Sequence, residues 1–173
     1  MTDTAYSLMT CYQGWAIYQR MLTGVVAPLS TDQLDLAALP GKWSVGQTIQ
    51  HIVANRVWWF RLWLGQGEPA LTSYLSWDPS GVADPPQIGV ADLVDGLAAT
   101  WAMVERALAG WTPADLAETI PVPDTLSPEE QEIFRASSRG WIIWHVLEHE
   151  IHHGGEISLV LGMNGIPGIY GEF

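Results

Sequence analysis

The residues with the clearest chemical potential in this sequence form a run of histidines near its C-terminal end. Four of the five histidines fall within nine consecutive positions: His145, His149, His152 and His153. Neutral imidazole is the commonest protein ligand for zinc, nickel, iron and copper. Side chains four residues apart on a helix point the same way, so His149 and His153 are placed to bind one ion together. The run therefore predicts a divalent metal site.

One ion cannot be held by the whole row. On a helix, His145 and His153 would be about 12 Å apart along the axis, whereas a metal–nitrogen bond is about 2 Å long. The site must use either His145 with His149 or His149 with His153, and it must take its remaining ligand from elsewhere. The histidine left for this purpose is His51.

The pattern of apolar residues is helical almost throughout, and no segment alternates convincingly with the period of a strand. We expect long helices over residues 4–29, 44–64, 90–111 and 138–163, with a shorter one beginning at Ser127-Pro128. Ser44 and Gln47 have the spacing of a capping box. The stretch 69–89 is rich in Pro, Gly and Ser and indicates a crossover. The sequence predicts an all-α protein: a four-helix bundle with a long crossover connection, with residues 1–173 forming a single domain.

Composition and charge limit the classes of partner. No run of eighteen uncharged apolar residues occurs, and the N-terminus lacks the features of a signal peptide, so we expect a soluble, cytoplasmic protein without a membrane partner. The formal net charge of -12 would repel polyanions, which excludes nucleic acid as an expected partner. The lone Cys11 cannot form an internal disulfide, and its apolar helical surroundings predict a buried structural residue. Most of the ten tryptophans are expected in the core or in pocket walls.

The histidines share their helix face with apolar residues. Within an arc of roughly 80° on the helix 138–163 lie six side chains: Ile142, His145, His149, His153, Glu156 and Val160. An imidazole buried without a partner costs about 1 to 3 kcal/mol, and a shared metal would satisfy several at once. His51, on the helix 44–64, could turn into the bundle toward this row.

Two glycines follow the histidines in the middle of the same helix. Gly154 and Gly155 each cost about 1 kcal/mol of helix stability relative to alanine. Close approach of a neighbouring helix or room for a substrate would explain them. A local kink without function is the alternative.

Two segments of the chain, 43–52 (WSVGQTIQHI) and 144–157 (WHVLEHEIHHGGEI), resemble the DinB/YfiT-like superfamily. The resemblance spans nearly the whole chain. It implies a four-helix bundle with a long crossover, often a homodimer, that holds a divalent metal through His51, His149 and His153. It also implies zinc or nickel as the metal, used in some relatives with a low-molecular-weight thiol for transfer or isomerisation of a small-molecule substrate.

The second segment departs from the family pattern. Many relatives have His-His-Arg-Gly-Gln where this chain has residues 152–156, HHGGE. The missing arginine removes a cation that could pair with a substrate carboxylate. Glu156 adds a carboxylate to the histidine face, where it could orient His153, complete the ligand set or act as a catalytic base. A plain hydrogen bond at the end of the bundle is the alternative.

Residues 149–153 also match the zinc-peptidase pattern HExxH, in which Glu150, between His149 and His153, would be the general base. The longer HExxHxxGxxH form is excluded because Glu156 stands where glycine is required. A distant glutamate ligand would have to be Glu172. The motif is short enough to arise by chance. If it did, we expect Glu150 to be a solvent-exposed residue beside the histidines.

Two classes of function remain. One is a metal-dependent enzyme, with thiol-dependent transferase or isomerase chemistry first and metal-assisted hydrolysis second. The other is a non-catalytic metal-binding stress or scaffold protein whose ion only ties two helices together. An open coordination position beside a pocket favours the enzyme, whereas a closed site completed by Glu156 or His145 favours the scaffold.

Overall fold

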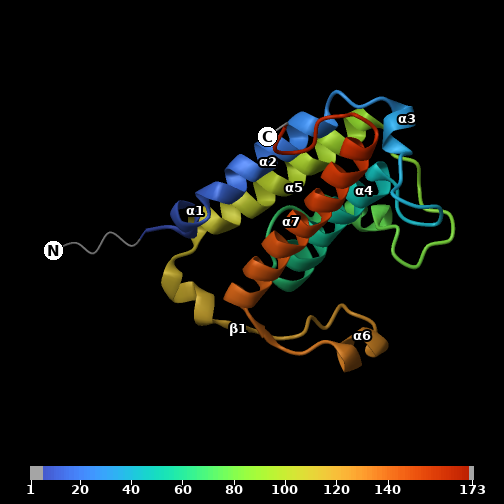
Figure 1. Cartoon of the computed structure of the whole chain (residues 1–173). Helices are drawn as coiled ribbons and strands as arrows, with labels where there is room; N and C mark the ends of the chain where they lie inside the picture. The colour runs from blue at the N-terminus through green and yellow to red at the C-terminus, as the bar shows by residue number, and fades with distance from the viewer. Residues whose placement is uncertain (1–5, 172–173) are drawn as a thin grey trace.

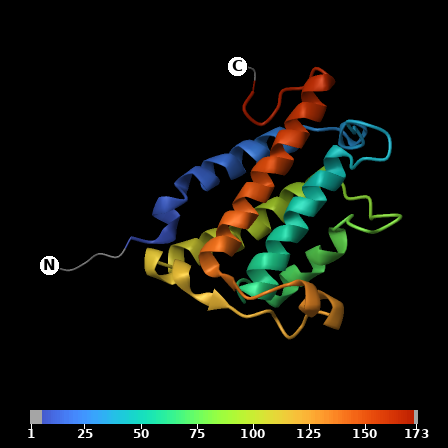
Figure 2. The same ribbon diagram turned by 60° about the horizontal axis from the view of Figure 1, so that its bottom comes forward.

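Long helices packed side by side form the body of the protein (Figure 1). The computed structural model of the chain describes residues 6–171. Its long helical segments are α2 (Gln13–Val26), α4 (Val45–Arg56) with its π-helical continuation η1 (Val57–Trp63), α5 (Val90–Gly110) and α7 (Arg139–Met163). Figure 2 shows α7 running between α2 and α4, with α5 behind them. The predicted all-α class is confirmed. None of the described helices combines the length and the apolar character that a membrane span needs.

Short elements connect these helices. They are α1 (Leu8–Cys11), α3 (Thr31–Leu34), the 3-10 helices η2 (Pro69–Trp77) and η3 (Pro113–Ala117), the strands β1 (Thr119–Ile120) and β2 (Ser137–Ser138), and α6 (Pro128–Ile133). The strands pair antiparallel, with Thr119 opposite Ser138, and so place the start of α7. The predicted crossover 69–89 exists, and η2 occupies its first part.

The first predicted helix is only partly correct. Its expected start at Thr4 lies outside the described residues, and the helix is interrupted at Tyr12, between α1 and α2. Cys11 lies at this interruption and is exposed, so the expectation of a buried cysteine is wrong. The helical pattern continues across the break, which is why periodicity alone did not locate it.

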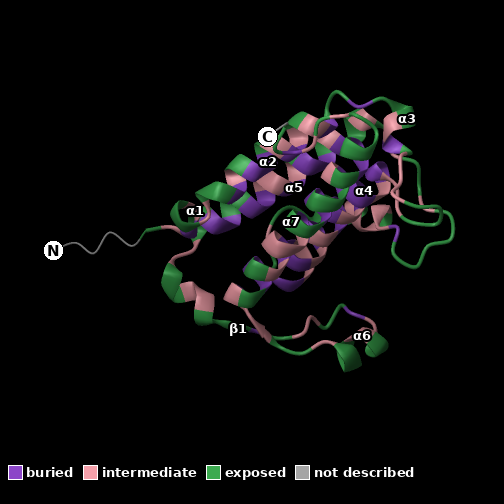
Figure 3. Ribbon diagram, viewed as in Figure 1, coloured by how far each residue is buried: buried purple, intermediate pink, exposed green. Residues whose placement is uncertain are grey.

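Most tryptophans do lie in the core or in pocket walls. Trp15, Trp59 and Trp63 are almost fully buried. Trp141 and Trp144, at the start of α7, are exceptions with 43% and 55% of their surface exposed. Figure 3 shows the buried residues on the facing sides of the long helices.

The two helices that carry the histidines begin at side-chain caps. At the start of α4, the Ser44 hydroxyl accepts from the Gln47 N–H at 3.3 Å, and the Gln47 side chain accepts from the Ser44 N–H at 2.9 Å. This is the predicted capping box. At the start of α7, the Ser138 hydroxyl accepts from the Trp141 N–H at 3.1 Å. Both starts are therefore fixed by local sequence.

Gly154 of α7 leaves room for the side chain of Tyr18 from α2. A Cβ at this position would overlap the hydroxyl group of Tyr18 and would lie 2.8 Å from the Ile169 Cδ1 atom. Tyr18 is nearly buried and donates its hydroxyl proton to the Glu150 carbonyl at 2.8 Å, so it cannot easily move away. A Cβ at Gly155 would meet nothing within 4 Å. The Tyr18 and Ile169 side chains thus explain the first glycine, and the second remains unexplained.

The glycine pair supplies a matched stability test. Gly154→Ala should lower the free energy of unfolding by about 1 to 3 kcal/mol because Tyr18 and Ile169 must shift. Gly155→Ala should raise it by about 0.5 to 1 kcal/mol because alanine is the better helix former and has room. Urea unfolding of both variants measures the two changes. Equal effects on stability would contradict the close contact at Gly154.

Candidate metal centre

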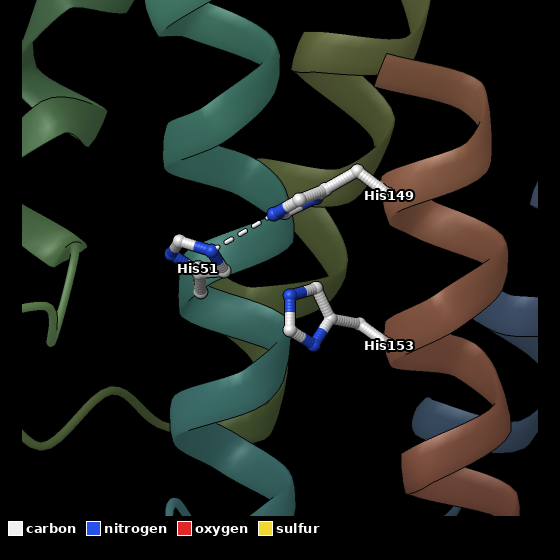
Figure 4. Close-up of side chains that lie close together, drawn as sticks. All are labelled: His51, His149 and His153. Atoms are coloured by element: carbon white, nitrogen blue, oxygen red, sulfur yellow. Dashed lines mark hydrogen bonds between the residues drawn. The ribbon is translucent and has the colours of Figure 1, made fainter. Parts of the chain in front are cut away.

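Three histidines from two neighbouring helices converge on one point. His51 lies on α4, and His149 and His153 lie one turn apart on α7 (Figure 4). One ring nitrogen from each lies within 4.8 Å of the others. The Nε2 atoms of His51 and His149 are 3.0 Å apart, and the ring of His153 turns one nitrogen toward them.

The other ring nitrogen of each histidine contacts a polar side chain. The Nδ1 atoms pair as follows: His51 with the carboxylate of Asp78 at 2.9 Å, His149 with the amide of Asn55 at 3.1 Å, and His153 with the carboxylate of Glu156 at 2.7 Å. Asp78 and Glu156 accept a hydrogen bond from Nδ1 of His51 and His153, which fixes these two rings with the Nε2 lone pair free. The atom of Asn55 that faces His149 is the amide nitrogen, a donor, so His149 would present its Nε2 lone pair only with the amide reversed.

The arrangement fits a divalent ion. The Nε2 atoms of His51 and His149 lie within hydrogen-bond distance, and a divalent ion that displaced the proton between them would be bound by both atoms and by a nitrogen of His153. Two nitrogens bound to the same ion at about 2 Å lie roughly 3 Å apart, in keeping with the 3.0 Å between His51 and His149. Three neutral imidazoles suit zinc, nickel and other first-row metals, so the donor set alone does not select one.

The electrostatics keep the two α7 histidines neutral. Burial, with smaller contributions from the neighbouring histidines, His153 first, lowers the pKa of His149 to about 3. Burial also lowers the pKa of His153, although its hydrogen bond with Glu156 opposes the shift. A neutral imidazole is the form that binds a metal. The two α7 histidines are therefore ready to bind at neutral pH.

Asp78 is ionised in this environment. Burial disfavours its charged form, but the hydrogen bonds from His51 and Ser80 outweigh burial and hold the pKa of Asp78 at about 2. A carboxylate beside an imidazole N–H makes the other ring nitrogen more basic. Asp78 is thus suited to strengthen His51 as a ligand.

Pockets lie on two sides of the centre. One of about 550 Å³ reaches His153 and Glu156 and is walled by the loop before α4 and by the second half of α7. Another of about 390 Å³ reaches His149 and Asp78 and is lined by aromatic rings: Trp58, Trp59 and Phe134. Trp43 separates the larger pocket from His51, with its ring centroid 4.7 Å from that of the histidine. Small molecules therefore have space beside the three nitrogens.

Comparison with known proteins identifies the family. The sequence profile of the DinB superfamily matches residues 16–157. The chain belongs to the DinB superfamily. A DinB-like protein from Bacillus cereus is similar in structure, with a TM-score of 0.63 and 20% identity over 91% of this chain and 93% of that one. A conserved protein from Enterococcus faecalis has a TM-score of 0.62 and 14% identity over 91% and 99%. These identities show a shared fold alone, and no curated protein matches the chain.

The structure brings together the three histidines that the DinB resemblance implies. Of the two pairs left open by the spacing on α7, it is His149 with His153 that faces His51. His145 lies elsewhere: its ring stacks on Trp141 at 4.9 Å, and its Nδ1 lies 3.3 Å from a Glu148 carboxylate oxygen. Metal binding by the three-histidine cluster remains a prediction.

Glu156 and Glu150, the two predicted catalytic residues, occupy very different places in this DinB protein. Glu156 is half-exposed and forms its hydrogen bond with His153 at the edge of the larger pocket. Glu150 is fully buried, so the expectation of a solvated flank is wrong for it. Its carboxylate accepts from Arg56 Nε at 2.6 Å and from Trp15 Nε1 at 2.9 Å. It points about 100° away from His149, toward α2 and the core.

Sequence reasoning gave no role to three residues around the centre. Asn55 follows His51 by four residues, so the i,i+4 spacing places it beside His51 but does not predict its contact with His149 on α7. Asp78 follows η2 in the crossover and accepts from the Ser80 N–H at 2.9 Å, a local turn that carries no signal of its distant partner. Trp43 carries no signal beyond its place in the family motif.

Glu150 allows a test that separates a structural role from catalysis. Glu150→Gln removes the negative charge and leaves that of Arg56 buried without compensation, so the free energy of unfolding should fall by about 3 kcal/mol. Metal stoichiometry should not change, because the carboxylate lies outside the histidine cluster. Urea unfolding and elemental analysis measure the two properties. The control Glu148→Gln should shift stability by less than about 1 kcal/mol, because Glu148 is half-exposed. A Glu150→Gln variant as stable as the wild-type protein would contradict the structural role of Glu150.

The lowered pKa of His149 predicts how the stability of the metal-free protein depends on pH. The unfolded histidine takes up a proton near pH 6.5 and the folded one only near pH 3. Between these values the unfolded state holds more protons, so the free energy of unfolding should fall as the pH is lowered from about 6.5 toward 3. Urea unfolding at a series of pH values measures this slope. His149→Gln should show a shallower slope, and an unchanged slope would contradict the burial of a neutral His149.

Proposed function

We propose that this DinB protein binds one divalent metal ion, zinc or nickel, through His51, His149 and His153, and uses it as an enzyme acting on a small molecule. The convergence of the histidine nitrogens, each ring held by a polar partner on its other side, carries this proposal. Such partners are typical of built metal sites, because they set the tautomer and the direction of each ring.

An open site supports catalysis over a scaffold role. In the part of the chain that the structure describes, the cluster around His51 contains three potential ligands and no fourth. Glu156 is engaged with the far nitrogen of His153, and His145 faces Trp141 and Glu148. Catalytic sites usually combine three protein ligands with an open position, whereas structural sites are closed by four.

The chemistry follows from the open position and from the residues around it. When bound, a divalent ion lowers the pKa of a thiol or water and polarises a carbonyl group. Thiol-dependent transfer or isomerisation, with a low-molecular-weight thiol, is our first choice, as the DinB resemblance implies, and hydrolysis is the second. Glu156 holds His153 and, at the pocket edge, is placed to accept a proton from a substrate.

The peptidase alternative gains no support from the geometry. An HExxH enzyme needs its glutamate beside the metal as a general base. Here both oxygens of Glu150 are occupied by Arg56 and Trp15 in the core. We therefore do not propose peptidase activity.

Adjacent histidines test the ligand set. His149→Ala should reduce bound zinc or nickel from about one ion per chain to a trace, because the ion would keep only two of its three protein ligands. His152→Ala is the matched control, since His152 lies next to His153 but has 64% of its side chain exposed. Elemental analysis after dialysis against each metal measures the stoichiometry. Equal loss in both variants would refute the assigned ligands.

Activity assays then separate the enzyme from the scaffold. Zinc-loaded and nickel-loaded protein is mixed with glutathione and chlorodinitrobenzene for thiol transfer, or with nitrophenyl acetate for hydrolysis. Turnover that disappears in His51→Ala supports the enzyme. One bound ion with no turnover in either assay, and a large loss of stability on metal removal, would favour the scaffold.

A further inference from the structure

The larger pocket beside the histidines contains the only lysine in the chain. Lys42 lines this pocket of about 550 Å³ together with His153 and Glu156. The formal net charge of the chain is -12. A cation in the wall of a pocket next to the proposed metal is therefore a local exception to the charge of the molecule.

Lys42 is presented by a well-defined turn. Its N–H donates to the Leu39 carbonyl at 3.1 Å, which closes a four-residue turn over Pro40 and Gly41. Gly41 has a φ of 77°, so proline and glycine occupy the positions that they prefer in a type II turn. The turn thus fixes the backbone of Lys42 at the rim of the pocket.

The charge of Lys42 is available to a ligand. Among the residues that the structure describes, no ion pair includes Lys42. Glu156, the carboxylate in the same pocket, is already engaged with His153 at 2.7 Å and lies 3.4 Å from His152. The pocket is therefore lined by one glutamate with partners and by one lysine that has no ion pair among residues 6–171.

The rest of the pocket wall is mainly apolar. Leu39 and Val45 line it on one side, and Ile157 and Val160 of α7 line it on the other. Its volume falls in the range of small-molecule sites, roughly 300 to 1,000 Å³. Such walls favour a hydrocarbon body over a fully polar ligand.

We propose that this pocket binds a small organic acid, with its carboxylate at Lys42 and its apolar body along the wall toward His153. The inference rests on the proposed function, because it names the class of molecule that the metal centre acts on. A neutral ligand of the same shape would leave the ammonium group without a partner, and a cationic one would be repelled by it. A bound divalent ion would add to the positive potential of the pocket and favour an anion further.

The single lysine makes direct observation possible. Protein labelled with carbon-13 lysine gives one lysine signal by NMR, which belongs to Lys42. Hexanoate serves as the probe and hexanamide as its neutral counterpart, each titrated into zinc-loaded and metal-free protein. We expect hexanoate to shift the Lys42 signal in a saturable manner, and hexanamide to bind at least about threefold more weakly.

Two charge-matched variants complete the test. Lys42→Gln should weaken hexanoate binding in calorimetry by about three- to tenfold, whereas Arg106→Gln, which removes an exposed positive charge from α5, should not. Both variants should keep the zinc stoichiometry of the wild type. The inference would be overturned by any of three results: hexanoate does not bind, the acid and the amide bind equally, or hexanoate binding depends on the metal but does not change in Lys42→Gln. Failure of the wild-type protein to bind zinc would instead refute the proposed function, so the two failures can be told apart.

Discussion

A buried ion pair between Arg56 and Glu150 holds the bundle in register. Both residues are fully buried, and two charges can be removed from water at tolerable cost only when every donor and acceptor finds a partner. Here they do. The guanidinium group donates hydrogen bonds to Glu150, to the Leu97 carbonyl at 3.0 Å, to Thr100 at 3.3 Å and to Gln19. The Glu150 carboxylate accepts a further hydrogen bond from Trp15. The network therefore joins α2, α4, α5 and α7 at one level.

The same pair lies beside the histidines on α4 and α7. Arg56 lies five residues after His51 on α4, and Glu150 directly follows His149 on α7. A slip of either helix along its axis by one residue, about 1.5 Å, would break the buried pair and would also separate the Nε2 atoms, which are now 3.0 Å apart. Consecutive residues on α7 point about 100° apart, so Glu150 can lock the core while His149 faces the site. Packing and metal geometry thus depend on one alignment.

The sequence predicted what local patterns encode. The boundaries of α4 taken together with η1, of α5 and of α7 follow from apolar periodicity and from caps such as Ser44. The HxxxH spacing predicts that His149 and His153 point the same way. Contacts between distant segments were not predictable. Asp78 reaches His51 across 27 residues of crossover, and no periodicity records that contact. Nor does a helical pattern show that Glu150 is the glutamate that enters the core, because the partner that stabilises its charge, Arg56, lies 94 residues away.

The net charge of the chain and the local charge of the pocket act over different distances. At physiological ionic strength, the field of exposed charges is screened within about 8 Å, so the many surface carboxylates matter little at the site itself. Close groups such as Lys42, Glu156 and the proposed metal ion would decide which ligands the pocket binds. At low salt the long-range repulsion extends further and should slow the approach of an anion, while its attraction to Lys42 becomes stronger. We therefore expect both the association rate and the dissociation rate of an anionic ligand to rise as salt is added. An anion site on a positively charged protein would not show this combination, because salt slows association there.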